Sequence, residues 1–170
     1  MLLSLAALAL LSSPYPFEIK SGFILEPTIG YLTQDNLDKD KTTAGLRLSY
    51  FRPDITDAVI ALELQALSAT TLTHPSDSKG GKRFVTNTDY FYEASAVFYE
   101  IYNPVAFRLA LGAGIERRHK NSFDLYYRGG LGRYFFKNFG CFADISGRMI
   151  FRSEKLAFPI ELGPSLQIIF

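Results

Sequence analysis

The stretch PIELGPSLQIIF, Pro159–Phe170, alternates between two kinds of side chain almost without interruption. One row is apolar and holds Ile160, Leu162, Pro164, Leu166, Ile168 and Phe170. The other row holds Glu161, Gly163, Ser165, Gln167 and Ile169. Successive side chains of a β-strand point to opposite faces, so a period of two residues indicates a strand with two unlike faces. The stretch therefore predicts a strand with one apolar face.

The same alternation recurs in seven segments upstream, which are Gly22–Leu32, Thr43–Phe51, Ala58–Leu67, Tyr90–Glu100, Val105–Glu116, Phe123–Phe136 and Phe139–Phe151. Short turns at 52–57, 102–104 and 137–138 contain the turn formers Pro, Asn and Asp. Longer connections at 33–42, 68–89, 117–122 and 152–156 alternate with these turns. The pattern predicts one all-β domain over residues 20–170, with eight antiparallel strands in up-and-down order and the long connections at one end.

Composition excludes several classes of function. The net charge is +1, so no excess of positive charge indicates nucleic-acid binding. Cys141 is the single cysteine, which rules out a disulfide within the chain, and no Cys/His spacing indicates a metal site. We expect no cofactor and no metal.

The N-terminal segment carries an apolar run of about ten residues, Leu2–Leu11. This length suits the core of a signal peptide and is too short for a membrane-spanning helix. We therefore assign residues 1–19 to a signal peptide and N-terminal segment, which predicts export.

Alternation alone does not decide which row faces inward. In a soluble lipocalin-like carrier the apolar rows would line the interior, whereas in a membrane barrel they would face lipid. Three features favour the membrane: polar rows of Gly, Ala, Ser and isolated charges, aromatic residues gathered near both strand ends, and strands of about nine to twelve residues. The sequence thus predicts a transmembrane β-barrel.

The C-terminal row Leu162, Pro164, Leu166, Ile168 and Phe170 resembles the signal that the barrel-assembly machinery reads in bacterial outer-membrane proteins. Residues 20–170 together resemble the small eight-stranded class, of the OmpA transmembrane-domain and OmpX type. The resemblance implies a bacterial outer-membrane location, periplasmic termini and loops that contact lipid, lipopolysaccharide or a host surface. It also implies the assembly machinery as a partner.

Eleven charged residues fall on rows predicted to point inward: Glu26, Arg47, Glu63, Glu93, Arg108, Glu116, Asp124, Arg128, Asp144, Arg148 and Glu161. An eight-stranded barrel leaves an interior just wide enough for side chains. Buried charges must be paired, and the arginine fork can bridge two carboxylates. We expect a polar plug in the lumen, with a narrow gated channel for ions or small solutes as the alternative.

Cationic residues at the long-connection end form a candidate rim for lipid phosphates: Lys79, Lys82, Arg83, Arg117, Arg118, Lys120, Arg152 and Lys155. His74 and His119 also lie in these connections. Neither lies on a strand beside a serine, so we expect no enzyme, although a rim enzyme acting on lipid A stays an alternative. The favoured function is that of an integral surface protein acting through its loops.

Overall fold

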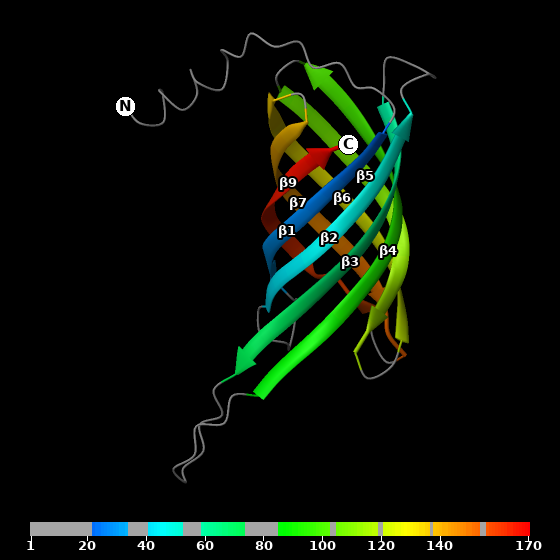
Figure 1. Ribbon diagram of the computed structural model, residues 1–170. Coiled ribbons are helices and arrows are strands. Elements are labelled where there is room, and N and C mark those ends of the chain that lie inside the picture. The colour runs from blue at the N-terminus through cyan, green and yellow to red at the C-terminus, as the bar shows by residue number, and fades with distance from the viewer. Residues whose placement is uncertain are drawn as a thin grey trace.

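The computed structural model describes residues 22–33, 41–52, 59–73, 85–102, 105–118, 121–136, 138–153 and 156–170. Within them, eight long strands form an antiparallel barrel (Figure 1): β1 (Gly22–Thr33), β2 (Lys41–Arg52), β3 (Val59–Thr73), β4 (Val85–Tyr102), β5 (Val105–Arg117), β6 (Asn121–Phe136), β7 (Phe139–Phe151) and β9 (Ile160–Ile169). The two-residue strand β8 (Leu156–Ala157) pairs with the end of β7. The expected signal peptide lies outside the described residues.

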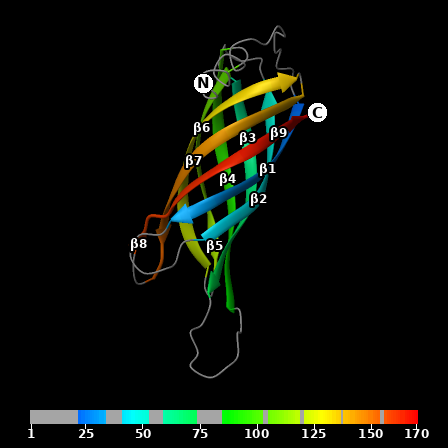
Figure 2. The same cartoon turned by 90° about the vertical axis from the view of Figure 1, so that its left-hand side faces the viewer.

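Closure of the barrel depends on the C-terminal stretch. Each long strand pairs with its neighbour in sequence, and β9 pairs with both β7 and β1. The amide of Phe170 also donates a 2.9 Å hydrogen bond to the carbonyl of Phe23. The start of β1 and the C-terminus therefore lie at the same end of the barrel, visible in Figure 2. The prediction of an eight-stranded up-and-down barrel is confirmed.

The β3–β4 hairpin is longer than the sequence analysis predicted. The sequence pattern predicts a connection over 68–89, but pairing continues to Thr73 opposite Val85, and the two strands extend beyond the rest of the barrel (Figure 1). The added segments are rich in Thr, a β-branched residue that favours strands. The apolar row ends at Ser68, so apolar alternation could not detect a strand that continues past it.

The two faces of the barrel wall differ sharply. Leu62, Leu64 and Leu109 point outward and are 64–69% exposed. Their neighbours Glu63 and Arg108 point inward and are 2% and 1% exposed. The apolar rows thus form the outer surface, and the soluble carrier with an apolar interior is excluded. Among the described residues, no helix is long and apolar enough to cross a membrane.

Outward aromatic pairs lie near both ends of the wall. Phe23 and Tyr50 are 5.1 Å apart between ring centroids at the end that holds the C-terminus, where Tyr102 and Phe107 also meet edge to face. Phe123 and Phe151 pair at 5.8 Å at the opposite end. Leucines fill the wall between them. This distribution is typical of membrane-spanning barrels, whose aromatic girdles lie at the two interfaces.

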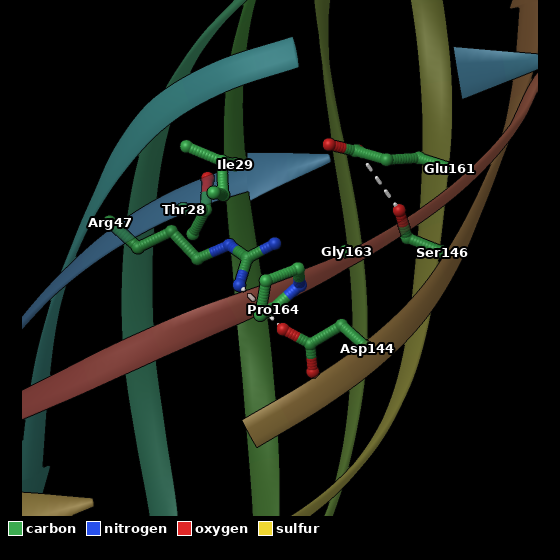
Figure 3. Close-up of a pocket in the computed structure, with 8 residues that line it drawn as sticks. All are labelled: Thr28, Ile29, Arg47, Asp144, Ser146, Glu161, Gly163 and Pro164. Carbon is green, nitrogen blue, oxygen red and sulfur yellow. Dashed lines mark hydrogen bonds and ion pairs between the residues drawn. The ribbon is translucent and has the colours of Figure 1, made fainter. Parts of the chain in front are cut away.

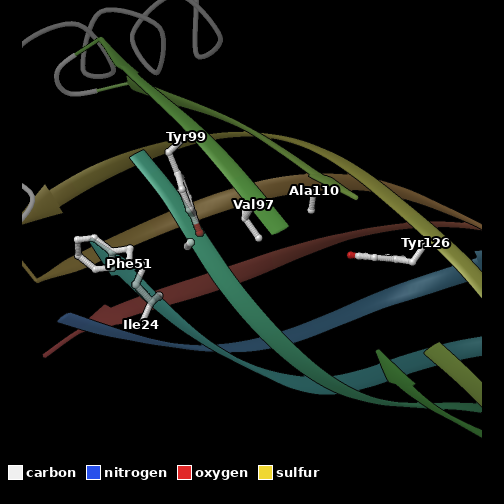
Figure 4. Packing of buried hydrophobic residues seen from close by; sticks show 7 residues of the cluster. Ile24, Phe51, Val97, Tyr99, Ala110 and Tyr126 are labelled. Atoms are coloured by element: carbon white, nitrogen blue, oxygen red, sulfur yellow. The ribbon is translucent and has the colours of Figure 1, made fainter. Parts of the chain in front are cut away.

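Apolar clusters inside the barrel lie on both sides of its charged centre. Ile24, Phe51 and Tyr99 belong to the cluster near the C-terminal end, shown in Figure 4. Leu32, Leu67, Ala69, Phe91 and Ile150 form a second cluster toward the long-connection end. The charges at the centre of the barrel therefore lie between two apolar clusters.

Candidate functional site

The interior is organised around Arg108, whose guanidinium bridges two carboxylates from different strands. Its Nη2 donates to Glu26 Oε1 at 2.9 Å, and its Nε donates to Asp144 Oδ1 at 3.0 Å. A Cβ atom on Gly130 would lie 2.8 Å from Arg108 Nε and 2.3 Å from Asp144 Oδ1. Gly130, which lies opposite Arg108 in the β5–β6 ladder, therefore provides the space for this ion pair.

Arg47 adds a second cation to the same two acids. It lies directly opposite Glu26 in the β1–β2 ladder and forms an ion pair with it. Its Nη1 also lies 3.0 Å from Asp144 Oδ2, and its Nε donates to Gln65 at 2.7 Å. Arg47, Arg108, Glu26 and Asp144 thus form one network across the lumen, which we call the central cluster.

Arg128 and Glu63 form a further buried pair beside the central cluster. Arg128 Nη2 lies 2.9 Å from Glu63 Oε2. Glu63 also accepts hydrogen bonds from Ser49 at 3.2 Å and Ser95 at 3.3 Å. The serines of the inward rows therefore serve as donors to the buried carboxylate, which needs several hydrogen bonds when it is removed from water.

Arg148 joins two acids nearer the long-connection end. It pairs with Glu93 and, at 3.0 Å, with Glu161. Its guanidinium also lies 4.8 Å from the ring centre of Phe91 and 5.1 Å from that of Tyr126. Such cation–π contacts are strongest away from water, and they hold Arg148 in one orientation.

The space left among these charges is small. Figure 3 shows Arg47 facing Asp144 and Ser146 facing Glu161 around a cavity. Its volume is about 10 Å³, roughly the room needed for one water molecule. Side chains therefore fill this part of the barrel.

All eleven residues predicted to face the lumen point into the barrel. Ten have at most 5% of their surface exposed, and the side chain of Asp144 is 7% exposed. Glu116 and Asp124, at 1% and 0%, lie toward the long-connection end. These residues therefore lie on the inner face of the wall.

Two inward residues of this end were missed. Lys41 is 2% exposed and pairs with the fully buried Asp89. The predicted second strand starts at Thr43 and leaves Lys41 in a connection, whereas β2 begins at Lys41. Continuing the alternation by two residues would have placed Lys41 beside Thr43 and Arg47.

The candidate phosphate-binding rim divides into three groups. Arg118 Nε lies 3.4 Å from Asp89, and Arg152 binds Glu116 with two hydrogen bonds of 3.0 and 2.6 Å. Arg117 is exposed on the outward row of β5. Lys79, Lys82, Arg83, Lys120 and Lys155, together with His74 and His119, lie outside the described residues. Of the rim arginines described, Arg118 and Arg152 therefore contact carboxylates of the chain, whereas Arg117 faces outward.

The candidate assembly signal lies on the outer face of β9. Leu162 is 52% exposed, Leu166 43% and Phe170 73%, and Pro164 and Ile168 share their row. Among the described residues, no group of three His, Cys, Asp or Glu side chains is arranged to hold a metal ion. The described geometry provides buried ion pairing inside and an apolar surface outside.

No protein-family model matches the chain, and no curated protein matches it. Among solved structures it is similar to Neisserial surface protein A (NspA), with a TM-score of 0.59 and 17% identity over 90% of this chain and 100% of that one. It is similar to the attachment invasion locus protein Ail of Yersinia pestis, with a TM-score of 0.56 and 16% identity over 88% of this chain and 100% of Ail. Ail has also been solved in complex with the heparin analogue sucrose octasulfate (TM-score 0.51, 15% identity, the same coverage). The likeness establishes a shared fold, the small barrel of outer-membrane proteins.

Proposed function

We propose that this chain is a non-enzymatic integral protein of a bacterial outer membrane, whose closed barrel anchors outward loops that contact lipid or a host surface. The observation that carries this proposal is the inverted wall, with exposed leucines outside and buried ion pairs inside. In a bilayer, the apolar outer surface of a barrel faces lipid and its polar residues face the interior. A closed barrel also pairs every backbone group between strands, as the absence of water in the bilayer core requires. The termini then face the periplasm, and the long β3–β4 hairpin projects outward.

The lumen is better suited to holding the barrel closed than to conducting ions. Arg108 and Arg128 are each 1% exposed and lie across the barrel bonded to acids of other strands. An ion could pass only if these bridges separated, because the cavity beside them has room for about one water molecule. We assign the interior charges a structural role, that of a plug.

The long-connection end is the side on which we place the ligand. Residues Lys79, Lys82, Arg83, Lys120 and Lys155 are cations of these connections, and Arg117 faces outward at the same end. The complex of Ail with a polysulfated sugar concerns a protein of the same fold and supports an anionic ligand here. Lipopolysaccharide phosphates are anions of this kind, and arginine and lysine bind them through charge-assisted hydrogen bonds.

Gel mobility with and without boiling tests membrane insertion. A folded barrel extracted in detergent should migrate faster before boiling than after it and show β-rich circular dichroism. A protein that stays soluble without detergent and shows no mobility shift would overturn the proposal.

An epitope inserted at residues 78–80 tests the orientation of the loops. It should be labelled by antibody on intact cells, and labelling only after lysis would contradict outward loops.

Planar-bilayer recording then separates the plug from a channel. The reconstituted barrel should show no sustained conductance, because Arg108 and Arg128 hold the lumen closed. Steady single-channel currents from pure, heat-modifiable protein would instead favour the gated channel. Mass spectra of lipid A test the rim enzyme. Lipid A should stay chemically unchanged with the parent protein and with His74→Ala and His119→Ala, since we assign neither histidine a catalytic role.

A further inference from the structure

The outer wall carries a depression over strands β2 to β5. Its volume is about 560 Å³, within the range of sites that hold drug-sized ligands. Its lining includes the large side chains of Leu48, Leu64, Tyr92 and Ile115 and the small ones of Ala94 and Ala113. A groove of this size in the apolar wall has the shape to receive a chain-like apolar ligand.

Strand register explains why the wall is hollow at this point. Ala94 lies between Leu64 of β3 and Ala113 of β5 in one row of outward residues. Two residues closer to the long connections, Ala66 lies between Leu46 and Tyr92. Methyl groups thus stand where most outward positions of these strands carry Leu, Ile or an aromatic ring, and the larger neighbours form the sides.

The apolar wall ends immediately next to this groove, on the side of the long connections. The next outward row toward the long-connection end holds Ser68, Tyr90 and Arg117, which are cross-strand neighbours. The row above it contains Thr70 and Thr88, whose hydroxyls are 3.1 Å apart. Arg117 lies two residues beyond Ile115, a rise of about 7 Å along a strand. The groove therefore ends at the polar margin of the wall, next to the outward cation Arg117.

We propose that this groove is the seat of an anionic, phosphate-bearing lipid, with an acyl chain against Ala94 and Ala113 and the phosphate on Arg117. The guanidinium fork of Arg117 matches phosphate, and charge-assisted hydrogen bonds are the stronger kind. Tyr90, 46% exposed beside Arg117, offers a phenolic hydroxyl at the same height. The site deepens the function proposed above and rests on the membrane location assigned there.

Charge argues against a second copy of the barrel as the occupant. A symmetric contact over the groove would bring Arg117 of both copies into one interface. Each guanidinium would then need a carboxylate partner to offset its charge. Among the described strand residues, Glu100 is the one acid on an outward row. It lies at the opposite end of β4 and cannot pair with Arg117. A phosphate lipid supplies the missing negative charge and the acyl chain together.

Native mass spectrometry of the detergent-solubilised barrel tests the site, with lipid A, phosphatidylcholine and uncharged diacylglycerol as probes. Ala113→Leu fills the groove, and Arg117→Gln removes the cation. The matched controls are Ala143→Leu on the outward row of β7 and Arg133→Gln on that of β6. We expect the parent and both controls to retain lipid A over the other two lipids. Each site variant should lose roughly tenfold in its affinity for lipid A, Arg117→Gln because it removes one charge-assisted hydrogen bond and Ala113→Leu because it occupies the space of the acyl chain.

Equal lipid A retention by the parent and both site variants would overturn the site, as would equal losses in the site variants and their controls. A dimer that Ala113→Leu abolishes without changing lipid binding would assign the groove to a second copy and also overturn it. The same samples are run on gels with and without boiling. A mobility shift in every variant with no lipid preference refutes the lipid site alone, whereas absence of the shift from the parent refutes the membrane barrel itself.

Discussion

Replacing Glu26 with glutamine tests whether the central cluster stabilises the barrel. Glu26 is fully buried and bound to Arg47 and Arg108, and Gln167 Nε2 donates to it at 2.7 Å. Glutamine has nearly the same shape, so the change opens no cavity. It removes one negative charge and turns an amide NH₂ toward groups that are themselves donors. The effect on the free energy of unfolding is therefore electrostatic.

The loss of unfolding free energy caused by Glu26→Gln depends on the partners that the two arginines keep. Removing one member of a buried ion pair typically costs about 3–5 kcal/mol, because the other charge is left uncompensated. In this barrel Arg47 and Arg108 both keep Asp144, with Arg47 Nη1 3.0 Å from it. One carboxylate then serves two arginines, and we expect Glu26→Gln to lower the free energy of unfolding by about 3 kcal/mol, the lower end of that range.

The assay is guanidinium unfolding in lipid vesicles, followed by gel mobility and fitted by linear extrapolation. Glu100→Gln is the matched control, because Glu100 is exposed near the short-turn end of β4 and accepts a hydrogen bond from the exposed Tyr102. It should change the free energy by less than about 0.5 kcal/mol, as surface changes usually do. Equal stability of the two variants, or a loss below about 1 kcal/mol for Glu26→Gln, would refute the stabilising role of the cluster.

Three further substitutions test the closure, the interior and the outer face. Gly163→Ala should destabilise the β1–β9 seam by about 1–3 kcal/mol in the same unfolding assay, because its Cβ would lie 2.0 Å from the Ile29 carbonyl oxygen, whereas Gly129→Ala, with its nearest contacts at 3.8 and 3.9 Å, should be neutral; equal effects would contradict this geometry. Arg148→Lys should cost about 2 kcal/mol, since a lysine cannot reproduce the fork that bonds Glu93 and Glu161, and wild-type stability would show that the fork is dispensable. The natural chain has no tryptophan, so Leu111→Trp, at a site 64% exposed in mid-wall, should be quenched by lipids brominated deep in the acyl chain more than Tyr102→Trp near the strand end, and the reverse order would contradict the assigned depth.

Sequence reasoning predicted the barrel because lipid and a crowded lumen place opposite demands on adjacent residues. In β5, Arg108 is buried and Leu109 is exposed, and this contrast repeats on every long strand. The end of the β3–β4 hairpin was missed because the contrast stops at Ser68, where the outer face becomes polar. Beyond that residue, pairing depends on backbone hydrogen bonds and β-branched side chains, which give a weaker signal.

The candidate site could be predicted only as a set of inward residues. Alternation placed Glu26 and Asp144 inside, but their shared contact with Arg108 depends on barrel closure, which brings β1, β5 and β7 together across the lumen. Arg118 and Arg152 appeared as solvent-facing rim cations, yet they contact Asp89 and Glu116. Sequence spacing carries no information about distances across the barrel, so it could not assign these partners.

By itself, the sequence determined the strand period, the identity of the two faces and the antiparallel order, because each depends on neighbouring residues and on the lengths of the connections. The tertiary structure decided which acid each arginine binds, how little space remains between them and where the outer wall is hollow. Those features arise from strand tilt and register around the closed barrel, which bring Arg108 to Glu26 and set Ala94 beside Ala113. They are set by the geometry of the closed sheet as a whole, and no single strand contains them.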